Sequence, residues 1–250
     1  MTQLLTYQTI TKTPLPYMDS EGITRYLCRI LAWVSRSYIL DFKGLEKIGP
    51  EYDPFIIVPN HNMRVEAVLL PSMLAFHRRG KLIHFLADWQ FLMVPLIATL
   101  YRRSRIIPIA RKDAKPKFLN IFKRFFDRGN ALDIAKEKIQ MGRSIGIFPE
   151  GTMNRNTNQL LRGHFGAARL ALETGVNLIP AGLEFPEVPM GESIRDTSKM
   201  CIHIGDPISP SGLSANNNHI RQLHEQVMTQ IAVLSNKSWS WDAPKRRIHG

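Results

Sequence analysis

The chain has 250 residues, of which 44% are hydrophobic and 22% are charged, a composition that excludes a disordered chain and a protein with many membrane spans. Its length suits one domain with a sizeable hydrophobic core. Lysine and arginine number 33 against 21 acidic residues, and the net charge of +12 favours an anionic partner: nucleic acid, an anionic lipid surface or a phosphorylated substrate. The two cysteines, Cys28 and Cys201, are too few for a disulfide framework, which favours a reducing compartment.

The N-terminal part predicts a loose leader followed by an amphipathic helix. Residues 1–20 are polar, contain two prolines and do not resemble a secretory signal. In residues 23–34 apolar side chains recur at the spacing of a helix, while arginines fall elsewhere around it. Two interpretations of this helix stay open: packing on the core with a solvated arginine side, or lying in the headgroup layer of a membrane. The longest apolar run, 91–101, is too short to cross a bilayer, so we expect any membrane contact to be peripheral.

Short β-rich segments then alternate with helical ones, which predicts an α/β fold: a single domain with a mixed, largely parallel central sheet flanked by helices. Strands are expected at 55–58, 82–87, 105–110, 144–148, 176–185 and 199–204. Helices are expected at 65–76, 116–126, 131–141, 165–174, with Gly175 ending it, and 216–234. We divide the chain into a leader with a membrane-facing helix (1–41), an α/β domain (42–210) and a C-terminal helix with a basic tail (211–250).

Two segments combine aromatic and basic side chains. Residues 116–126 contain four phenylalanines, Lys117, Lys123 and Arg124, a mixture that suits a lipid interface, nucleic acid, or a core helix with a charged outer side. The tail, residues 239–247, contains two tryptophans and three basic residues, and we interpret it as disordered or as a further membrane contact.

The first candidate site is the segment Pro-Asn-His-Asn-Met-Arg-Val-Glu-Ala at 59–67, directly after the strand 55–58. A histidine at the end of a strand lies on the edge of the sheet where α/β proteins place their sites. His61 can act there as a general base, and Glu66, one turn into the next helix, can accept a hydrogen bond from its Nδ1. Taken alone, this spacing favours a structural histidine, because it arises easily by chance in a chain with eight histidines.

The second candidate site is Ile-Phe-Pro-Glu-Gly-Thr at 147–152. The strand 144–148 ends at Pro149, a carboxylate follows, and Gly151 lets the backbone come close to a ligand. Because both segments follow strands, we expect them along the same carboxyl edge of the sheet and therefore in one cleft.

Together these segments resemble the glycerolipid acyltransferase family, of which bacterial 1-acylglycerol-3-phosphate acyltransferase is typical. That family has Asn-His followed after four residues by Asp, an arginine after a second apolar strand, Phe-Pro-Glu-Gly-Thr-Arg, and an apolar strand ending near a proline. The similar segments here are Asn60 and His61 with Glu66, the run 105–111 ending at Arg111, residues 148–152 and residues 178–182. The resemblance covers about residues 42–208.

The resemblance implies that His61 removes the proton of an acceptor hydroxyl as this attacks an acyl thioester, acyl-CoA or acyl-ACP, and that Glu66 fixes the imidazole tautomer. It implies no covalent acyl-enzyme, no metal and no cofactor besides the thioester. The implied acceptor is a lysophospholipid, with 1-acylglycerol-3-phosphate, converted to phosphatidate, as the first candidate. The implied substrate-binding residues are Arg111, Phe148, Pro149, Glu150, Gly151 and Thr152. We expect a peripheral or monotopic protein on the cytoplasmic face of an anionic membrane, without a nucleic-acid partner.

This chain departs from the family's pattern at three places. The aspartate is replaced by Glu66, which is one methylene longer. The arginine after Phe-Pro-Glu-Gly-Thr is replaced by Met153, with Arg155 two residues later. The usual lysine is absent from residues 87–91. The last two departures lie among the acceptor-binding elements, so a different lysolipid stays open as the alternative acceptor.

Other classes of function stay open as alternatives. Gly-Arg-Ser-Ile-Gly at 142–146 matches the nucleophile elbow of serine hydrolases, but an elbow needs a strand before the serine and a helix after it, and here the predicted order is reversed. A nucleic-acid module would use the +12 charge, but no known nucleic-acid motif is visible. A lipid-binding protein of the same fold that lost catalysis through Glu66, or an acyltransferase for a different lysolipid, are the remaining alternatives.

Overall fold

The computed structural model describes residues 6–18, 20–93, 99, 102–110, 113, 117–127 and 129–245. At its centre is a seven-stranded sheet in the order β1-β7-β6-β2-β5-β3-β4. The strands are β1 (Ile39–Lys43), β2 (Ile56–Pro59), β3 (His84–Asp88), β4 (Ile107–Ile109), β5 (Ile145–Gly146), β6 (Leu178–Glu184) and β7 (Met200–Ile204). Neighbouring strands from β6 to β4 are parallel, β7 is antiparallel to β6, and β1 is parallel to β7. The predicted single α/β domain with a mixed, largely parallel sheet is confirmed.

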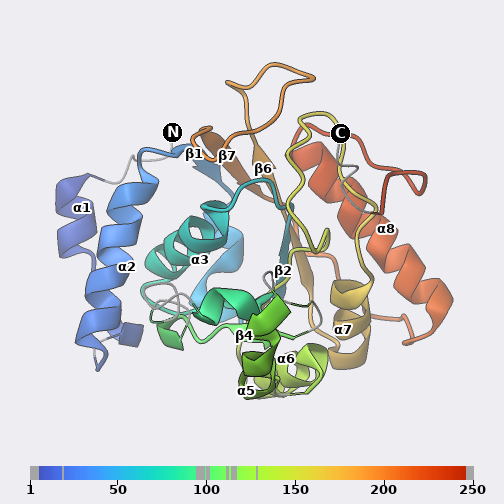
Figure 1. Ribbon diagram of the computed structural model, residues 1–250, viewed down its shortest axis with the longest axis horizontal. Coiled ribbons are helices and arrows are strands. Elements are labelled where there is room, and N and C mark those ends of the chain that lie inside the picture. Colours follow the sequence, from blue (N-terminus) through green and yellow to red (C-terminus); the bar gives the residue numbers. More distant parts are fainter. Residues whose placement is uncertain are drawn as a thin grey trace.

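Helices cover both faces of this sheet (Figure 1). The α-helices are α1 (Tyr7–Lys12), α2 (Gly22–Ser35), α3 (Glu66–His77), α5 (Lys123–Phe126), α6 (Ala131–Gln140), α7 (Gly166–Thr174) and α8 (Asn217–Leu234). Short 3-10 helices are η1 (Pro16–Met18), η2 (Leu45–Ile48), η3 (Pro50–Tyr52), η4 (Trp89–Met93) and η5 (Lys117–Phe122). In Figure 1, α1 to α3 lie to the left of the sheet, and α7 and α8 lie to the right.

The core is divided by the sheet because successive strand residues point to opposite faces. In β2, Ile57 packs in the cluster that includes α3, whereas Ile56 and Val58 pack in the cluster that includes α6, α7 and α8. All four residues of β2 are buried, as expected for a parallel strand covered on both faces. This central strand therefore carries the loop of the first candidate site on a rigid support.

The N-terminal segment is not the loose leader that its polarity predicts. It forms α1 and η1, and its apolar residues Ile10, Leu15 and Met18 are buried. The Arg29 guanidinium of α2 donates hydrogen bonds to the backbone carbonyls of Ile10 and Thr13, which joins the two helices. Three apolar side chains at irregular spacing are therefore enough to anchor this segment to the rest of the domain.

Helix α2 packs against α3 through a stripe of small side chains, of which Cys28 and Ala32 are buried. Its large apolar residues remain outside the core: Ile23 is 59% exposed, Tyr26 is 66% exposed and Trp33 is 46% exposed. The helix is therefore packed on the domain and still presents an apolar outer surface. None of the described helices is both long enough and apolar enough to cross a membrane.

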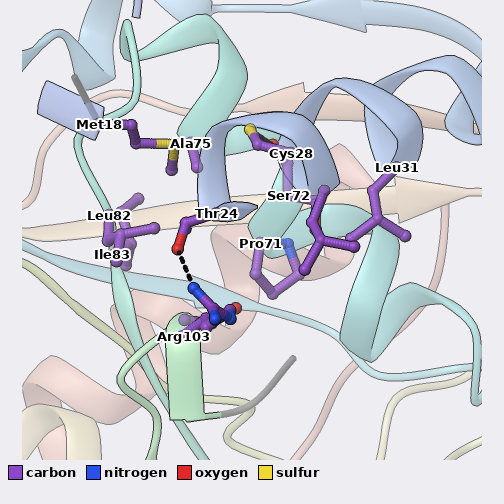
Figure 2. A pocket seen from close by; sticks show the side chains of 12 residues that line it. Met18, Thr24, Cys28, Leu31, Pro71, Ser72, Ala75, Leu82, Ile83 and Arg103 are labelled. Atoms are coloured by element: carbon purple, nitrogen blue, oxygen red, sulfur yellow. Dashed lines mark hydrogen bonds between the residues drawn. The ribbon is translucent and has the colours of Figure 1, made fainter. Parts of the chain in front are cut away.

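A cavity lies between α2 and α3, and Figure 2 shows the side chains that line it. Its walls are largely apolar, with Leu31 and Pro71 on opposite helices. At one end Arg103 donates a hydrogen bond of 3.3 Å to the Thr24 hydroxyl. The lining includes none of the predicted site residues that the structure describes.

Three further elements differ from the sequence prediction. Strand β1 was not predicted, because its pattern is too short to be distinguished from the preceding helix, but it pairs with β7. The predicted helix at 116–126 is divided into η5 and α5, and residue 116 lies outside the described residues. The sequence predicts that residues 239–247 are disordered or contact a membrane; the part that the structure describes, residues 239–245, packs against α8 through Trp239 and Trp241.

Candidate active site

The two candidate segments meet at the carboxyl edge of the sheet, as their positions after strands predict. Strands β2 and β5 are parallel neighbours, with Ile57 opposite Gly146, so the loops that follow them start side by side. The backbone N–H of His61 donates to Glu150 Oε1 at 3.1 Å. The backbone N–H of Asn154 donates to the carbonyl of His61 at 2.7 Å. Two loops far apart in the sequence therefore form one site.

The imidazole of His61 forms a close pair with the carboxylate of Glu66. His61 Nδ1 lies 2.5 Å from Glu66 Oε1, and the backbone N–H of Asn62 donates to the same oxygen. Glu66 is the first residue of α3 and is fully buried, a position where the helix dipole favours a negative charge. Because a carboxylate can only accept, Nδ1 carries the hydrogen, and Nε2 is the basic nitrogen. The longer glutamate side chain thus spans the distance to the imidazole.

The plane of the imidazole is supported by Phe148. The two ring centroids lie 4.5 Å apart, and Phe148 in turn packs 5.5 Å from the ring of Phe85 on β3. The side chain of His61 remains 17% exposed, so a substrate can reach it from one side. The geometry therefore provides a nitrogen base with its tautomer and its plane both fixed.

Glu150 lies beneath His61 and is only 1% exposed. Its carboxylate accepts from the backbone N–H of His61, from the backbone N–H of Leu161 at 2.9 Å, and from Asn154 Nδ2 at 2.8 Å. Burial raises the pKa of Glu150, and these hydrogen-bond donors oppose the shift. Both oxygens of this carboxylate accept hydrogen bonds from the protein itself, and these bonds join the two site loops.

The other residues of the second segment differ in exposure. Pro149 is buried, Phe148 and Thr152 are partly buried, and Gly151 is exposed. Gly151 has a φ of +63°, and a Cβ at this position would lie 2.8 Å from the ring of His164. Both facts favour glycine here. Arg111, predicted to bind the acceptor, lies outside the described residues.

Two polar residues near the site have structural partners. Asn60 is buried, and its side chain exchanges hydrogen bonds with the backbone of Leu183 at 2.7 and 3.1 Å, which fixes the start of the loop to β6. Arg155, the candidate replacement for the family's arginine, forms an ion pair of 2.7 Å with Asp196 and donates to the carbonyl of Ile194 at 2.8 Å. The guanidinium of Arg155 therefore binds the neighbouring loop that contains Ile194 and Asp196.

Lys237 is a site residue that the sequence analysis missed. Its ammonium donates to Asn62 Oδ1 and to the carbonyl of Asn156, both at 2.6 Å. The contact joins residues 175 positions apart, so no local pattern could have indicated it. Its sequence signal is weak: a lysine three residues after the end of the closing helix.

The serine of the apparent nucleophile elbow is structural. Ser144 is fully buried, donates its hydroxyl hydrogen to Asp53 and accepts from the backbone N–H of Phe55 at 3.1 Å. It lies before β5 and after α6, the reverse of the order in an elbow. The hydrolase alternative therefore has no support in the structure.

The fold and the site define an α/β protein with a partly exposed histidine, oriented by a buried carboxylate, at the carboxyl edge of a mostly parallel sheet. Residues 40–184 match the sequence model of the family named Acyltransferase. The chain belongs to this family. Comparison with curated protein sequences found no match.

A solved structure with a similar fold is the crystal structure of the 1-acyl-sn-glycerophosphate (LPA) acyltransferase, PlsC, from Thermotoga maritima. The TM-score is 0.58, and the match covers 89% of this chain and 85% of that chain at 20% sequence identity. At this identity the likeness shows a common fold.

Proposed function

We propose that this protein moves a fatty acyl group from an acyl thioester, acyl-CoA or acyl-ACP, to the hydroxyl of a lysophospholipid, with 1-acylglycerol-3-phosphate as the first candidate. The observation that carries the proposal is the pair of His61 Nδ1 and Glu66 Oε1, 2.5 Å apart at the edge where the family-matched strands end. The name of the structurally similar PlsC supports this acceptor class.

In the proposed reaction His61 Nε2 accepts the proton of the acceptor hydroxyl as its oxygen attacks the thioester carbonyl. The buried carboxylate of Glu66 stabilises the imidazolium that forms. The C–O ester bond forms, the C–S bond breaks, and the departing thiolate takes the proton from the imidazolium. A thiolate is a good leaving group, so the step requires no metal or cofactor.

The acceptor is proposed to lie against Phe148, Gly151 and Thr152, whose surfaces are at least partly open. Pro149 and Glu150, which are buried, hold this loop in place beneath His61. Arg111 remains the proposed phosphate ligand by family resemblance, because a guanidinium suits a phosphate group.

A peripheral position on the cytoplasmic face of an anionic membrane suits the exposed surface of the protein. On α1 and α2, Tyr7 and Trp33 pack edge to face at 6.1 Å and remain exposed, and the Arg36 guanidinium lies 4.4 Å from the Trp33 ring. On η5 and α5, Phe118 and Phe125 are 68% and 63% exposed beside basic residues. Exposed aromatic residues next to cations are typical of surfaces that enter a headgroup layer.

The test is an assay of the purified full chain with a panel of lysolipids and both thioester donors, with products identified by mass spectrometry. We expect one lysolipid to gain one acyl chain and the donor to release one thiol. A folded protein that binds anionic vesicles but forms no acyl product with any pair would favour the lipid-binding alternative and contradict the proposal.

A further inference from the structure

The segment after α8, residues 236–245, lies along the loop of the second candidate segment, and we call it the C-terminal strap. Ser238 forms a parallel bridge with Gln159. The backbone N–H of Leu160 donates to the carbonyl of Ser238 at 3.0 Å, and the N–H of Ser238 donates to the carbonyl of Asn158 at 2.8 Å. The strap is thus attached to this loop by one β-bridge with two backbone hydrogen bonds.

Aromatic packing fixes the strap in this position. The rings of Trp239 and Trp241 lie 5.1 Å apart, and both contact the buried His224 of α8, with centroids at 5.9 and 5.8 Å. Phe165, beside α7, packs 6.2 Å from Trp241. The Arg221 guanidinium lies 4.3 Å from the Trp241 ring. Such packing gives the strap a defined path and a defined position for each of its side chains.

The strap brings the side chain of Lys237 to the rear of the catalytic pair. Its ammonium donates to Asn62 Oδ1 at 2.6 Å, and the backbone N–H of Asn62 donates to Glu66 Oε1, the oxygen that contacts His61. Both Glu66 and Glu150 act electrostatically on this ammonium. Lys237 therefore places a positive charge near two carboxylates and one imidazole.

The positive charge of Lys237 compensates the negative charge that is buried in this cluster. Glu66 and Glu150 are 0% and 1% exposed, and buried charges are costly unless other charges offset them. Among the described residues, Glu66 Oε2 is buried without a hydrogen-bond partner. Two uncompensated carboxylates would hold a proton on the neighbouring imidazole, and a protonated imidazole cannot act as a base.

We propose that Lys237 is a positioning residue of the active site: its ammonium offsets the charge of Glu66 and Glu150 and holds Asn62 in place, so that the His61 imidazole stays neutral and correctly oriented. This inference rests on the proposed role of His61 as the base. Burial lowers the pKa of Lys237 to about 8, and the two carboxylates oppose the shift, so the ammonium is present at neutral pH.

The experiment is an NMR titration of the His61 imidazole in the full chain, with the signal assigned from a His61→Gln variant. Lys237→Gln removes the charge but keeps a donor for Asn62. We expect it to raise the midpoint of the His61 titration by about one pH unit, because a cation near the imidazole is lost. Lys237→Arg keeps the charge and should leave the midpoint within about 0.3 units of the parent. The matched control is Lys136→Gln, which removes the charge of a lysine on α6 and should leave the midpoint of the His61 titration unchanged.

A Lys237→Gln protein with the parental midpoint would overturn the proposal. A second measurement needs no variant: in the parent protein, the His61 signal should show a further inflection near pH 8, where the Lys237 ammonium loses its proton. A His61 signal that stays flat while the Lys237 Nζ signal itself titrates in the same experiment would also contradict the proposal.

An activity assay separates this inference from the proposed function. At pH 7 Lys237→Gln should lower kcat by about two- to fivefold, and one further pH unit should restore much of the rate, since more of the base is then deprotonated. A merely structural role would lower the rate equally at all pH values. Absence of acyl transfer by the parent would contradict the proposed function, and full activity of His61→Ala would contradict the assignment of His61 as the base; in both cases the titration still measures the effect of Lys237 on His61.

Discussion

Glu150 Oε1 accepts the backbone N–H of His61 at 3.1 Å, so one buried carboxylate joins two loops whose residues are 89 positions apart. The other oxygen, Oε2, accepts from Leu161 and Asn154. The carboxylate thus acts as a bridge between the base and the loop proposed to hold the acceptor.

Replacing this bridge should lower both stability and activity. Glu150→Gln keeps the size but directs an amide N–H towards groups that are themselves donors, so at least one buried donor loses its acceptor. We expect a loss of about 2 kcal/mol in the free energy of unfolding, measured by urea titration. Turnover should fall as well, because the backbone of His61 is released. Parental stability for Glu150→Gln would contradict the bridging role.

The proposed base gives the largest effect on turnover. His61→Ala should lower kcat by about a hundredfold or more, since positioned proton transfer typically contributes 10² to 10⁴. Circular dichroism and vesicle binding should match the parent, because the side chain is partly exposed and does not belong to the hydrophobic core. A folded His61→Ala protein with the parental rate would exclude His61 as the base.

The partner of the base should show non-additive effects. Glu66→Gln keeps the size but cannot stabilise an imidazolium, so much of the same rate should be lost, whereas Glu66→Asp should retain measurable activity. The double variant of His61→Ala with Glu66→Gln should have the rate of His61→Ala alone, because both residues serve one proton transfer. Rate measurements on all four variants test this, and additive losses would show that Glu66 acts independently of His61.

The sequence was sufficient for the part of the site that depends on local spacing. His61 and Glu66 are five residues apart across a strand end and a helix start, and this geometry follows from their order in the chain. The meeting of the two candidate segments followed from parallel strands, and β2 and β5 are indeed neighbours.

Contacts that depend on tertiary packing could not be predicted. Lys237 reaches Asn62 only because α8 lies against the sheet and the strap turns back along the loop. The interpretation of the tail as disordered is wrong for its described residues, 239–245, because Trp239 and Trp241 pack against His224, a contact that composition does not indicate. Likewise, the exposed residues of α2 have the same apolar pattern as core residues, and only packing against α3 distinguishes them.

Buried histidines predict a loss of stability in weak acid. Burial lowers the pKa of His84 and of His77 from 6.5 to about 4. Because the folded-state pKa lies below the unfolded value, the unfolded chain binds more protons between pH 6.5 and about 4. Stability should therefore be full above pH 6.5 and fall as the pH decreases towards 4. Urea unfolding between pH 7.5 and 5 measures this.

The variant His84→Gln isolates the contribution of His84 to the pH dependence of stability. His84 is 1% exposed, and its Nδ1 lies 2.9 Å from the carbonyl of Arg105, to which the neutral imidazole donates. His84→Gln keeps a donor for that carbonyl but has no proton to gain, so its stability should depend less steeply on pH than that of the parent. Equal slopes for parent and variant would contradict the assignment.

The apolar outer surface of α2 should bind the protein to anionic membranes. We expect the parent to co-sediment with anionic liposomes and to be released by high salt, since its basic residues add an electrostatic attraction that salt screens. Replacing Tyr26 and Trp33 by serine should lower the affinity for liposomes by at least about tenfold, because the variant lacks the two large exposed side chains that enter the headgroup layer in the parent.

The matched control is Val233→Ser on α8. It removes a side chain that is 71% exposed but lies on another helix, so it should leave liposome binding unchanged. Equal binding of the double variant and the parent would show that α2 does not face the membrane, and a protein released only by detergent would show that its attachment is not peripheral.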